Sequence, residues 1–311
     1  MTIKYLVLCG GGPVGLTIYG ALKELHKENV WKLENIKTIY ATSIGCLITL
    51  AVILDIEWAW LDDYIIKRPW LNLMNFTSSD YLNLMYSKGL LDEDFIIDII
   101  KPLLLTKDID IDVTLKEFYE TTNVDLHLFT TNLNKFCKVD LNYKTHPDLK
   151  LYTAFMMSCC IPILIKPPYY NGEYYLDGGL FTNTPVNDCI GTEKCKKSEM
   201  LVFINDKRNP IDISNNYYID HANSDISDNI TDNSNLFSFV VFMLKTIFKK
   251  IMLVENENAI PVKNTINVCI SPNSVDINYW SYVFGNKDER IRLIEIGKLQ
   301  AIKFMKKYKS K

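Results

Sequence analysis

Residues 5–15 read YLVLCGGGPVG, and residues 36–45 read IKTIYATSIG. Each stretch starts as an apolar run with the pattern of a strand and ends in a turn of small residues that opens a helical pattern. A strand, a tight turn and a helix that follow one another twice indicate parallel strands with helical crossovers. The sequence therefore predicts an α/β fold built around a largely parallel sheet.

The composition excludes several classes of protein. The 311 residues are 48% hydrophobic and 23% charged, and 34 basic residues are matched by 37 acidic ones. A disordered chain would be less apolar, and a protein that binds nucleic acid through bulk charge would be more basic. The longest apolar stretches, 47–54 and 236–244, are shorter than the roughly 18 residues that a membrane-spanning helix needs. We therefore expect a globular protein that binds no nucleic acid.

The cysteines and the first residues indicate a cellular location. Eight cysteines stand mostly in apolar runs, without a CxxC pair or a repeated spacing. This distribution favours free thiols in a reducing compartment over a disulfide framework. No apolar signal core precedes the strand-like run Tyr5–Cys9. We expect a cytoplasmic protein with a single domain over residues 1–311 and a long polar surface loop at about 206–235.

The glycine-rich turn Gly10–Gly12, followed by Gly15, has three interpretations. Its Gly-x-Gly-x-x-Gly spacing after a strand matches the dinucleotide-binding fingerprint of FAD- and NAD-dependent oxidoreductases. That fingerprint requires an acidic residue at the end of the second strand, but the second strand here ends at Tyr40–Ser43, and Glu34 precedes it. Alternatively, the backbone N–H groups of such a loop stabilise an oxyanion at a helix N-terminus. The third interpretation is a tight turn without a ligand.

Ser43 is the candidate nucleophile. It lies in the sequence Ala41-Thr42-Ser43-Ile44-Gly45, between a predicted strand and a predicted helix. This arrangement is that of a Gly-x-Ser-x-Gly nucleophile elbow in which Ala41 replaces the first glycine. Alternatively, Ser43 is only the N-cap of the helix. A catalytic serine also needs a base, because its hydroxyl group is a weak nucleophile.

The base is harder to find. None of the four histidines, His26, His127, His146 and His221, stands in a sequence context typical of a catalytic triad. Asp177 ends a short predicted strand and is followed by Gly178 and Gly179, so its carboxylate could be held against another loop. Taken alone, this Asp-Gly-Gly sequence is equally typical of a simple turn.

The ordered set of motifs resembles the patatin-like phospholipase family. The set runs Gly-Gly-Gly-x-x-Gly, then x-x-Ser-x-Gly, then Asp-Gly-Gly. The segment 157–162 (MSCCIP) is similar to the family's Ala-Ser-x-Ala-x-Pro segment, and residues 177–186 are similar to its Asp-Gly-Gly-x-x-x-Asn-x-Pro motif. A closing helix over 281–307, with Gly297 and Ala301, is also similar to the family's last helix.

The resemblance implies a three-layer α/β/α sandwich and a serine acyl hydrolase that needs neither a metal nor an organic cofactor. Ser43 would be the nucleophile and Asp177 its general base. The N–H groups of Gly10, Gly11 and Gly12 would stabilise the oxyanion. The substrates would be phospholipids or related acyl lipids. The supporting glycines of these motifs would be Gly15, Gly45, Gly178 and Gly179.

The chain departs from the family pattern in the glycine loop. The family usually has Arg or Lys where Val14 stands, and Pro13 removes one N–H donor from the same stretch. Together with Ala41, these changes leave open a catalytically weakened, lipid-binding relative. An oxidoreductase that binds FAD or NAD through the loop Gly10–Gly15 is the alternative to a lipid hydrolase from another functional class.

An enzyme that acts on lipids has to reach a membrane or a micelle. The segment 237–254 is strongly apolar and carries Lys245, Lys249 and Lys250. It is either a core helix with a basic edge or an interfacial helix that makes peripheral contact with a membrane.

Overall fold

The computed structural model describes most of the chain. The described residues are 2–74, 76, 78–206, 211, 230–236, 238–244, 246–247, 250, 260–270 and 277–309. Most of the expected polar loop at 206–235 and the end of the apolar segment 237–254 therefore lie outside the described residues. The division into domains stays a prediction.

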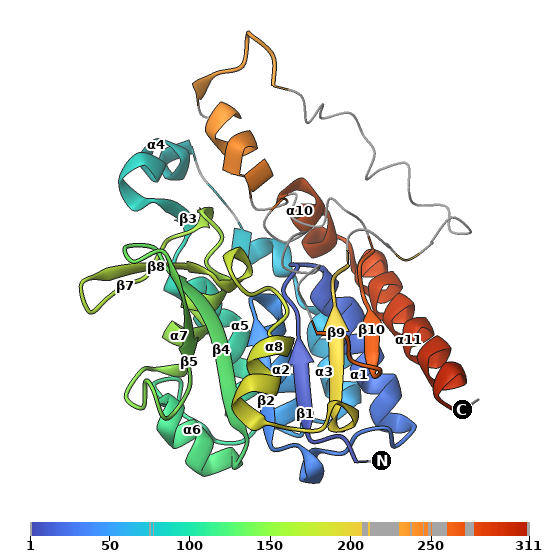
Figure 1. The fold of residues 1–311 in the computed structure, drawn as a ribbon. Helices are drawn as coiled ribbons and strands as arrows, with labels where there is room; N and C mark the ends of the chain where they lie inside the picture. Colours follow the sequence, from blue (N-terminus) through green and yellow to red (C-terminus); the bar gives the residue numbers. More distant parts are fainter. Residues whose placement is uncertain are drawn as a thin grey trace.

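The central sheet is largely parallel, as the two strand–turn–helix units predict. Its strands run in the order β10-β9-β1-β2-β4-β8-β7, and β5 pairs with β4 (Figure 1). The pairs β10–β9, β9–β1, β1–β2 and β2–β4 are parallel, whereas β4–β5, β4–β8 and β7–β8 are antiparallel. The bounds of these strands are β1 Tyr5–Leu8, β2 Thr38–Thr42, β4 Asp125–Asn132, β5 Cys137–Leu141, β7 Tyr169–Tyr170, β8 Glu173–Asp177, β9 Met200–Ile204 and β10 Thr265–Asn267.

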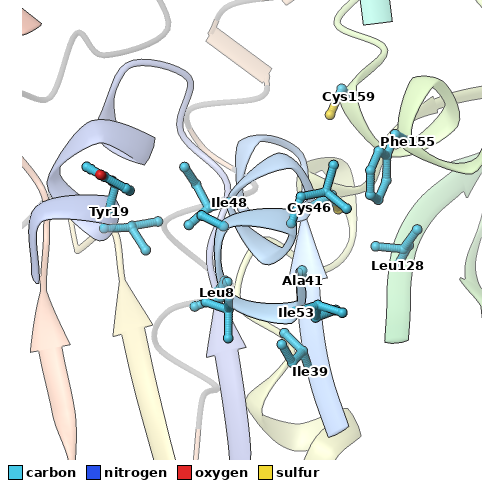
Figure 2. Close-up of a cluster of buried hydrophobic side chains, with 14 of the residues drawn as sticks. Leu8, Tyr19, Ile39, Ala41, Cys46, Ile48, Ile53, Leu128, Phe155 and Cys159 are labelled. Carbon is cyan, nitrogen blue, oxygen red and sulfur yellow. The ribbon is translucent and has the colours of Figure 1, made fainter. Parts of the chain in front are cut away.

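Helices cover both faces of this sheet. Successive strand residues point to opposite faces, so Leu6 and Leu8 enter a large core, whereas Val7 enters a smaller core next to α8. In the larger core, Leu8 and Ile39 of the strands lie beside Ile53 of α2 (Figure 2). The α-helices are α1 Val14–Lys27, α2 Ile44–Ile53, α3 Trp58–Lys67, α4 Ser78–Ser87, α5 Glu93–Leu105, α6 Leu115–Thr122, α7 Leu151–Cys159, α8 Val186–Glu193, α10 Ile277–Gly285 and α11 Lys287–Lys309. The expected three-layer sandwich is confirmed.

Short elements connect these layers. A second sheet pairs β3 (Gly89–Leu91) with β6 (Ile163–Ile165) in parallel. The 3₁₀ helices are η1 Leu33–Asn35, η2 Trp70–Met74, η3 Gly178–Leu180 and η4 Lys197–Glu199. Between α4 and α5, Gly89 opens β3 and lies so close to the end of β6 that a Cβ atom would be 2.2 Å from the backbone nitrogen of Lys166.

The expected single closing helix is wrong, because the chain forms two helices there. The helix α10 ends at Gly285, and α11 begins at Lys287. The side chain of Asn286 accepts hydrogen bonds from the backbone N–H groups of Asp288 and Glu289 and so caps α11. The break separates a short helix near the C-terminal ends of the parallel strands from a long helix that packs on α1 (Figure 1).

The described residues of the apolar segment 236–250 do not join the core. Its large apolar side chains Leu236, Phe239, Met243 and Ile247 are each at least 41% exposed, and their spacing of three or four residues places them on one helical face. The interpretation as a core helix is therefore wrong for this part of the segment. Within the described residues, no helix is both long enough and apolar enough to cross a bilayer.

Two glycines let α1 and α11 approach each other closely. A Cβ atom at Gly297 would lie 2.0 Å from the carbonyl oxygen of Thr17, and one at Gly20 would lie 2.0 Å from that of Ile294. Both obstacles are backbone atoms, which cannot move aside as a flexible side chain would. This contact fastens the last helix to the first.

We predict that Gly297→Ala lowers the free energy of unfolding by about 3 kcal/mol, because overpacking a close helix contact forces the two backbones apart. Gly191→Ala in α8 is the matched control, since nothing lies within 4 Å of its Cβ position. The control should be neutral or up to about 1 kcal/mol more stable. Urea denaturation measures both variants, and equal stability of the two would contradict the close contact.

Candidate active site

Ser43 stands on a strained turn between β2 and α2. Its backbone has φ 54° and ψ −128°, a conformation that side-chain-bearing residues rarely adopt. Gly45 makes this turn possible, because a Cβ atom there would lie 2.6 Å from the carbonyl oxygen of Leu8. Ala41 lies inside β2 and is absent from the residues with positive φ, so a glycine is not required at its position. The local structure is that of a nucleophile elbow.

Asp177 ends β8, which β4 separates from β2 in the sheet, and its side chain reaches Ser43. The hydroxyl group of Ser43 donates a hydrogen bond of 2.6 Å to Oδ2 of Asp177, although 134 residues separate them in the chain. The other carboxylate oxygen accepts a 2.7 Å bond from the N–H group of Gly179. Gly178 lies so close to β4 that a Cβ atom would be 2.1 Å from the carbonyl oxygen of Phe129. These contacts fix the carboxylate against the hydroxyl group.

Burial gives this carboxyl group an unusual acidity. Ser43 and Asp177 are only 5% and 4% exposed. Burial raises the pKa of Asp177 from 3.8 to about 6, and the hydrogen bonds from Ser43 and Gly179 partly oppose this rise. Asp177 is therefore ionised at neutral pH, yet it is a stronger base than a carboxylate in water.

The described histidines have other partners. His26 accepts a bond from the indole of Trp58, His127 bonds to Asp140, and His146 bonds to Thr145. His221 lies outside the described residues. Desolvation by burial lowers the pKa of His127, but the hydrogen bonds and negative charges of Asp125 and Asp140 outweigh it and raise the pKa to about 9. His127 thus serves as a buried cation on the α8 side of the sheet.

The glycine loop lies beside Ser43. Gly11 has φ 147° and Gly12 has φ 57°, two conformations that favour glycine. The N–H group of Gly10 donates to the carbonyl oxygen of Asn183 at 3.1 Å, so it is already engaged. Within the described part of the chain, no hydrogen bond takes up the N–H groups of Gly11 and Gly12. Successive backbone donors of this kind form an anion-binding site.

The remaining loop positions have packing roles. Gly15 lets α1 approach α2, since a Cβ atom there would lie 2.3 Å from the side chain of Ile44. Val14 begins α1 and is completely buried, so a basic side chain in its place would have to enter the core. Pro13 is the N-cap of α1 with φ −56°, where the loss of an N–H donor leaves no helical hydrogen bond unmade.

Three further residues hold the site together. Ser158 accepts a 3.0 Å hydrogen bond from the backbone N–H of Ser43 and donates to the carbonyl oxygen of Phe129. The side-chain amides of Asn183 and Asn205 donate to the carbonyl oxygen of Gly10, at 3.5 and 3.3 Å. Ser158 and Asn183 stand in recognisable motifs that do not reveal this role. The only sequence signal for Asn205 is a polar residue directly after a parallel strand.

An apolar pocket opens beside Ser43. It has a volume of about 150 Å³ and is lined by Ser43, by residues of α2, α3 and α5, and by Trp280 and Phe284 of α10. A cavity of about this size in another protein holds a benzene molecule, so this one has room for a short stretch of hydrocarbon. Trp280 also lies over the glycine loop, where a Cβ atom on Gly12 would be 2.2 Å from its ring.

Comparisons with known proteins point to one family. A model described as patatin-like phospholipase matches residues 6–190. The chain is similar to a probable lipid hydrolase, 463L, of Invertebrate iridescent virus 6, with 29% identity over 65% of this chain and 69% of that protein. It is similar to an uncharacterized protein of Acanthamoeba polyphaga mimivirus, with 26% identity over 67% of each chain. Its similarity to VipD from Legionella pneumophila has a TM-score of 0.49 and 15% identity, over 99% of this chain and 67% of that one.

We predict that Asp177→Asn makes the fold more stable at pH 8. The pKa of Asp177 is about 6 in the folded protein and near 3.8 in the unfolded chain. Ionisation of this group therefore lowers the free energy of unfolding of the wild type as pH rises from about 4 to about 6. At 1.36 kcal/mol per pKa unit, the variant should gain up to ~3 kcal/mol at pH 8 and almost nothing at pH 4. Urea denaturation at the two pH values tests this, and a variant less stable than the wild type at pH 8 would contradict it.

Proposed function

Because the chain belongs to the patatin-like phospholipase family, we propose that it is a lipid acyl hydrolase that cleaves carboxylic esters through an acyl-Ser43 intermediate. One observation carries this proposal, namely the buried 2.6 Å hydrogen bond from the hydroxyl group of Ser43 to Asp177. The bond lies beside an apolar pocket, so a nucleophile, a base and space for hydrocarbon meet at one place. The lipid hydrolase named among the similar proteins supports the same class of substrate.

The first half of the reaction forms the acyl-enzyme. Asp177 accepts the hydroxyl proton while Oγ of Ser43 attacks the ester carbonyl carbon, which gives a tetrahedral intermediate with a negative oxygen. Since Gly10 already donates to Asn183, we assign the oxyanion donors to the N–H groups of Gly11 and Gly12. The intermediate then collapses, the bond to the alcohol oxygen breaks, and protonated Asp177 donates its proton to that oxygen.

The second half releases the acyl chain. Asp177, again a carboxylate, accepts a proton from a water molecule as the water attacks the acyl-Ser43 carbonyl carbon. The same two N–H groups stabilise the second oxyanion. Collapse breaks the ester bond to Oγ, and the proton returns from Asp177 to Ser43. The products are a carboxylic acid and the free enzyme.

The substrate class follows from the surroundings of Ser43. The lining of the pocket is almost entirely apolar, which suits an acyl chain better than a sugar or a peptide. We propose phospholipids or related acyl lipids as substrates. The exposed apolar face of residues 236–247 would make peripheral contact with the membrane that holds them. A cytoplasmic location and the lack of nucleic-acid binding stay predictions.

The site does not favour the two alternatives. In an oxidoreductase, the glycine loop would lie against a pyrophosphate group, but here Trp280 and Asn205 pack against Gly12 and Gly11. A weakened, purely lipid-binding relative would be favoured if the departures from the family pattern separated Ser43 from Asp177. The departures at Pro13, Val14 and Ala41 instead leave the bond between Ser43 and Asp177 intact.

We predict that Ser43→Ala and Asp177→Asn each lower the rate of ester hydrolysis by at least about 1,000-fold, because each removes one member of a unit that acts together. Release of fatty acid from a panel of phospholipids and lysophospholipids measures the loss. Ser198→Ala is the matched serine control. Ser198 lies in η4, just before the N-terminal end of β9, and the variant should keep full activity. Unchanged hydrolysis by Ser43→Ala would rule out this mechanism.

A further inference from the structure

A second hollow, next to the apolar pocket, lies where α3, α10 and α11 meet. It has a volume of about 440 Å³, and its lining includes the four cations Lys67, Arg68, Lys287 and Arg290. We call it the basic hollow. Figure 1 shows α10 and the beginning of α11 at the end of the molecule toward which the parallel strands point, the end that also carries Ser43. No aspartate or glutamate belongs to the described lining of the hollow.

Arg290 forms the inner wall of the basic hollow. Only 5% of it is exposed. Its guanidinium group donates to the carbonyl oxygens of Val283, Phe284 and Ile66, and its Nε has no hydrogen-bond partner. An arginine stays charged in proteins, and a buried charge without an opposite charge is costly. Within the described residues, Arg290 bonds to no carboxylate, so an anion in the hollow would supply the missing counter-charge.

The other three cations stand at the rim of the hollow. Arg68 bonds to the phenol of Tyr64 and to the carbonyl oxygen of Asp98, neither of which is charged. Lys67 pairs with Asp63 at 2.7 Å, but both side chains are more than 60% exposed, and a pair of this kind is weak. The rim therefore keeps most of its positive charge.

The acidic side chains that directly precede Arg290 in the sequence do not neutralise the hollow. Glu289 is buried and accepts two hydrogen bonds of 2.6 Å from Arg292 and a third, of 3.1 Å, from the phenol of Tyr279, so its charge is already paired. Asp288 is exposed to solvent and follows the exposed Lys287. The chain as a whole has a net charge of −3, so the positive charge here is a local arrangement.

The basic hollow borders on the apolar pocket. Phe284 and Arg290 line both, so hydrocarbon and positive charge meet at a shared wall. Leu71, which also lines the hollow, is 45% exposed. An apolar side chain at the mouth of a basic site suits a ligand with an anionic group and a hydrocarbon part, and it suits a soluble polyanion less well.

We propose that the basic hollow binds the phosphate group of an anionic lipid headgroup and thereby holds the Ser43 end of the molecule against an anionic bilayer. This inference deepens the proposed function, because docking serves catalysis only if Ser43 acts on lipids. The binding itself requires no reaction. Attraction of about 1 kcal/mol for each basic side chain near such a surface corresponds to a factor of about five in affinity.

The test measures sedimentation of the full chain with vesicles of ether-linked phosphatidylcholine, with or without ether-linked phosphatidylglycerol. These lipids contain no ester, so binding is independent of acyl-Ser43 chemistry. A failure of the proposed hydrolysis would appear in the phospholipid panel and not here. We expect the wild type to prefer the anionic vesicles, and we expect this preference to weaken as salt is added.

The double variant Lys67→Gln/Lys287→Gln should bind anionic vesicles about 25-fold more weakly than the wild type. Lys303→Gln/Lys306→Gln is the matched control, because it removes two exposed charges from the other end of α11. The control should bind like the wild type, and equal thermal unfolding midpoints would verify that both variants fold.

Equal losses in the two double variants would overturn the proposal, because the attraction would then depend on total charge alone. A wild type that shows no preference for anionic vesicles would also overturn it. Saturable binding of inorganic phosphate without that preference would assign the hollow to a soluble anion and exclude the lipid headgroup.

Discussion

The hydrogen bond between Ser43 and Asp177 is the contact on which the candidate site depends. It joins side chains 134 residues apart, and the sheet brings them together through β4. Thr42, next to Ser43, pairs with Phe129 of β4, and Asp177 itself pairs with Thr130, the next residue along β4. A slip of one residue in either pairing would turn these side chains to the opposite face. The register of three strands therefore sets the geometry of the dyad.

Holding that carboxylate in the core works against stability. Burial disfavours its charged form, and a single backbone N–H group from Gly179 and the hydroxyl group of Ser43 compensate only in part. The strained backbone of Ser43 adds to the cost. The close contact of α1 with α11, at Gly20 and Gly297, contributes packing that offsets such local costs. The site and the scaffold thus have opposite effects on the free energy of unfolding.

Local sequence patterns predicted much of this structure. The two strand–turn–helix units follow from short-range signals and are confirmed. The resemblance to a family, read from ordered motifs, added Asp177. Side-chain type alone could not select it, since an Asp-Gly-Gly sequence is also a common turn.

Long-range contacts could not be predicted in this way. The break at Gly285 and Asn286 is a different case, because its cap is local and Gly and Asn are typical residues at helix ends. Asn205 contacts Gly10 across 195 residues, and Arg290 contacts Ile66 across 224. No local pattern encodes such pairs. The basic hollow in particular gathers cations from two distant segments of a chain whose overall charge is slightly negative.

The central claim is that a buried carboxylate activates Ser43. The most direct measurement is the rate at which a fluorophosphonate probe modifies the wild type as a function of pH, with the modified peptide identified by mass spectrometry. The account predicts a single modified residue, Ser43, and a rate that rises with pH around a pKa of about 6, as Asp177 ionises. Modification of another residue, or a rate at Ser43 that does not change between pH 4 and pH 8, would contradict it.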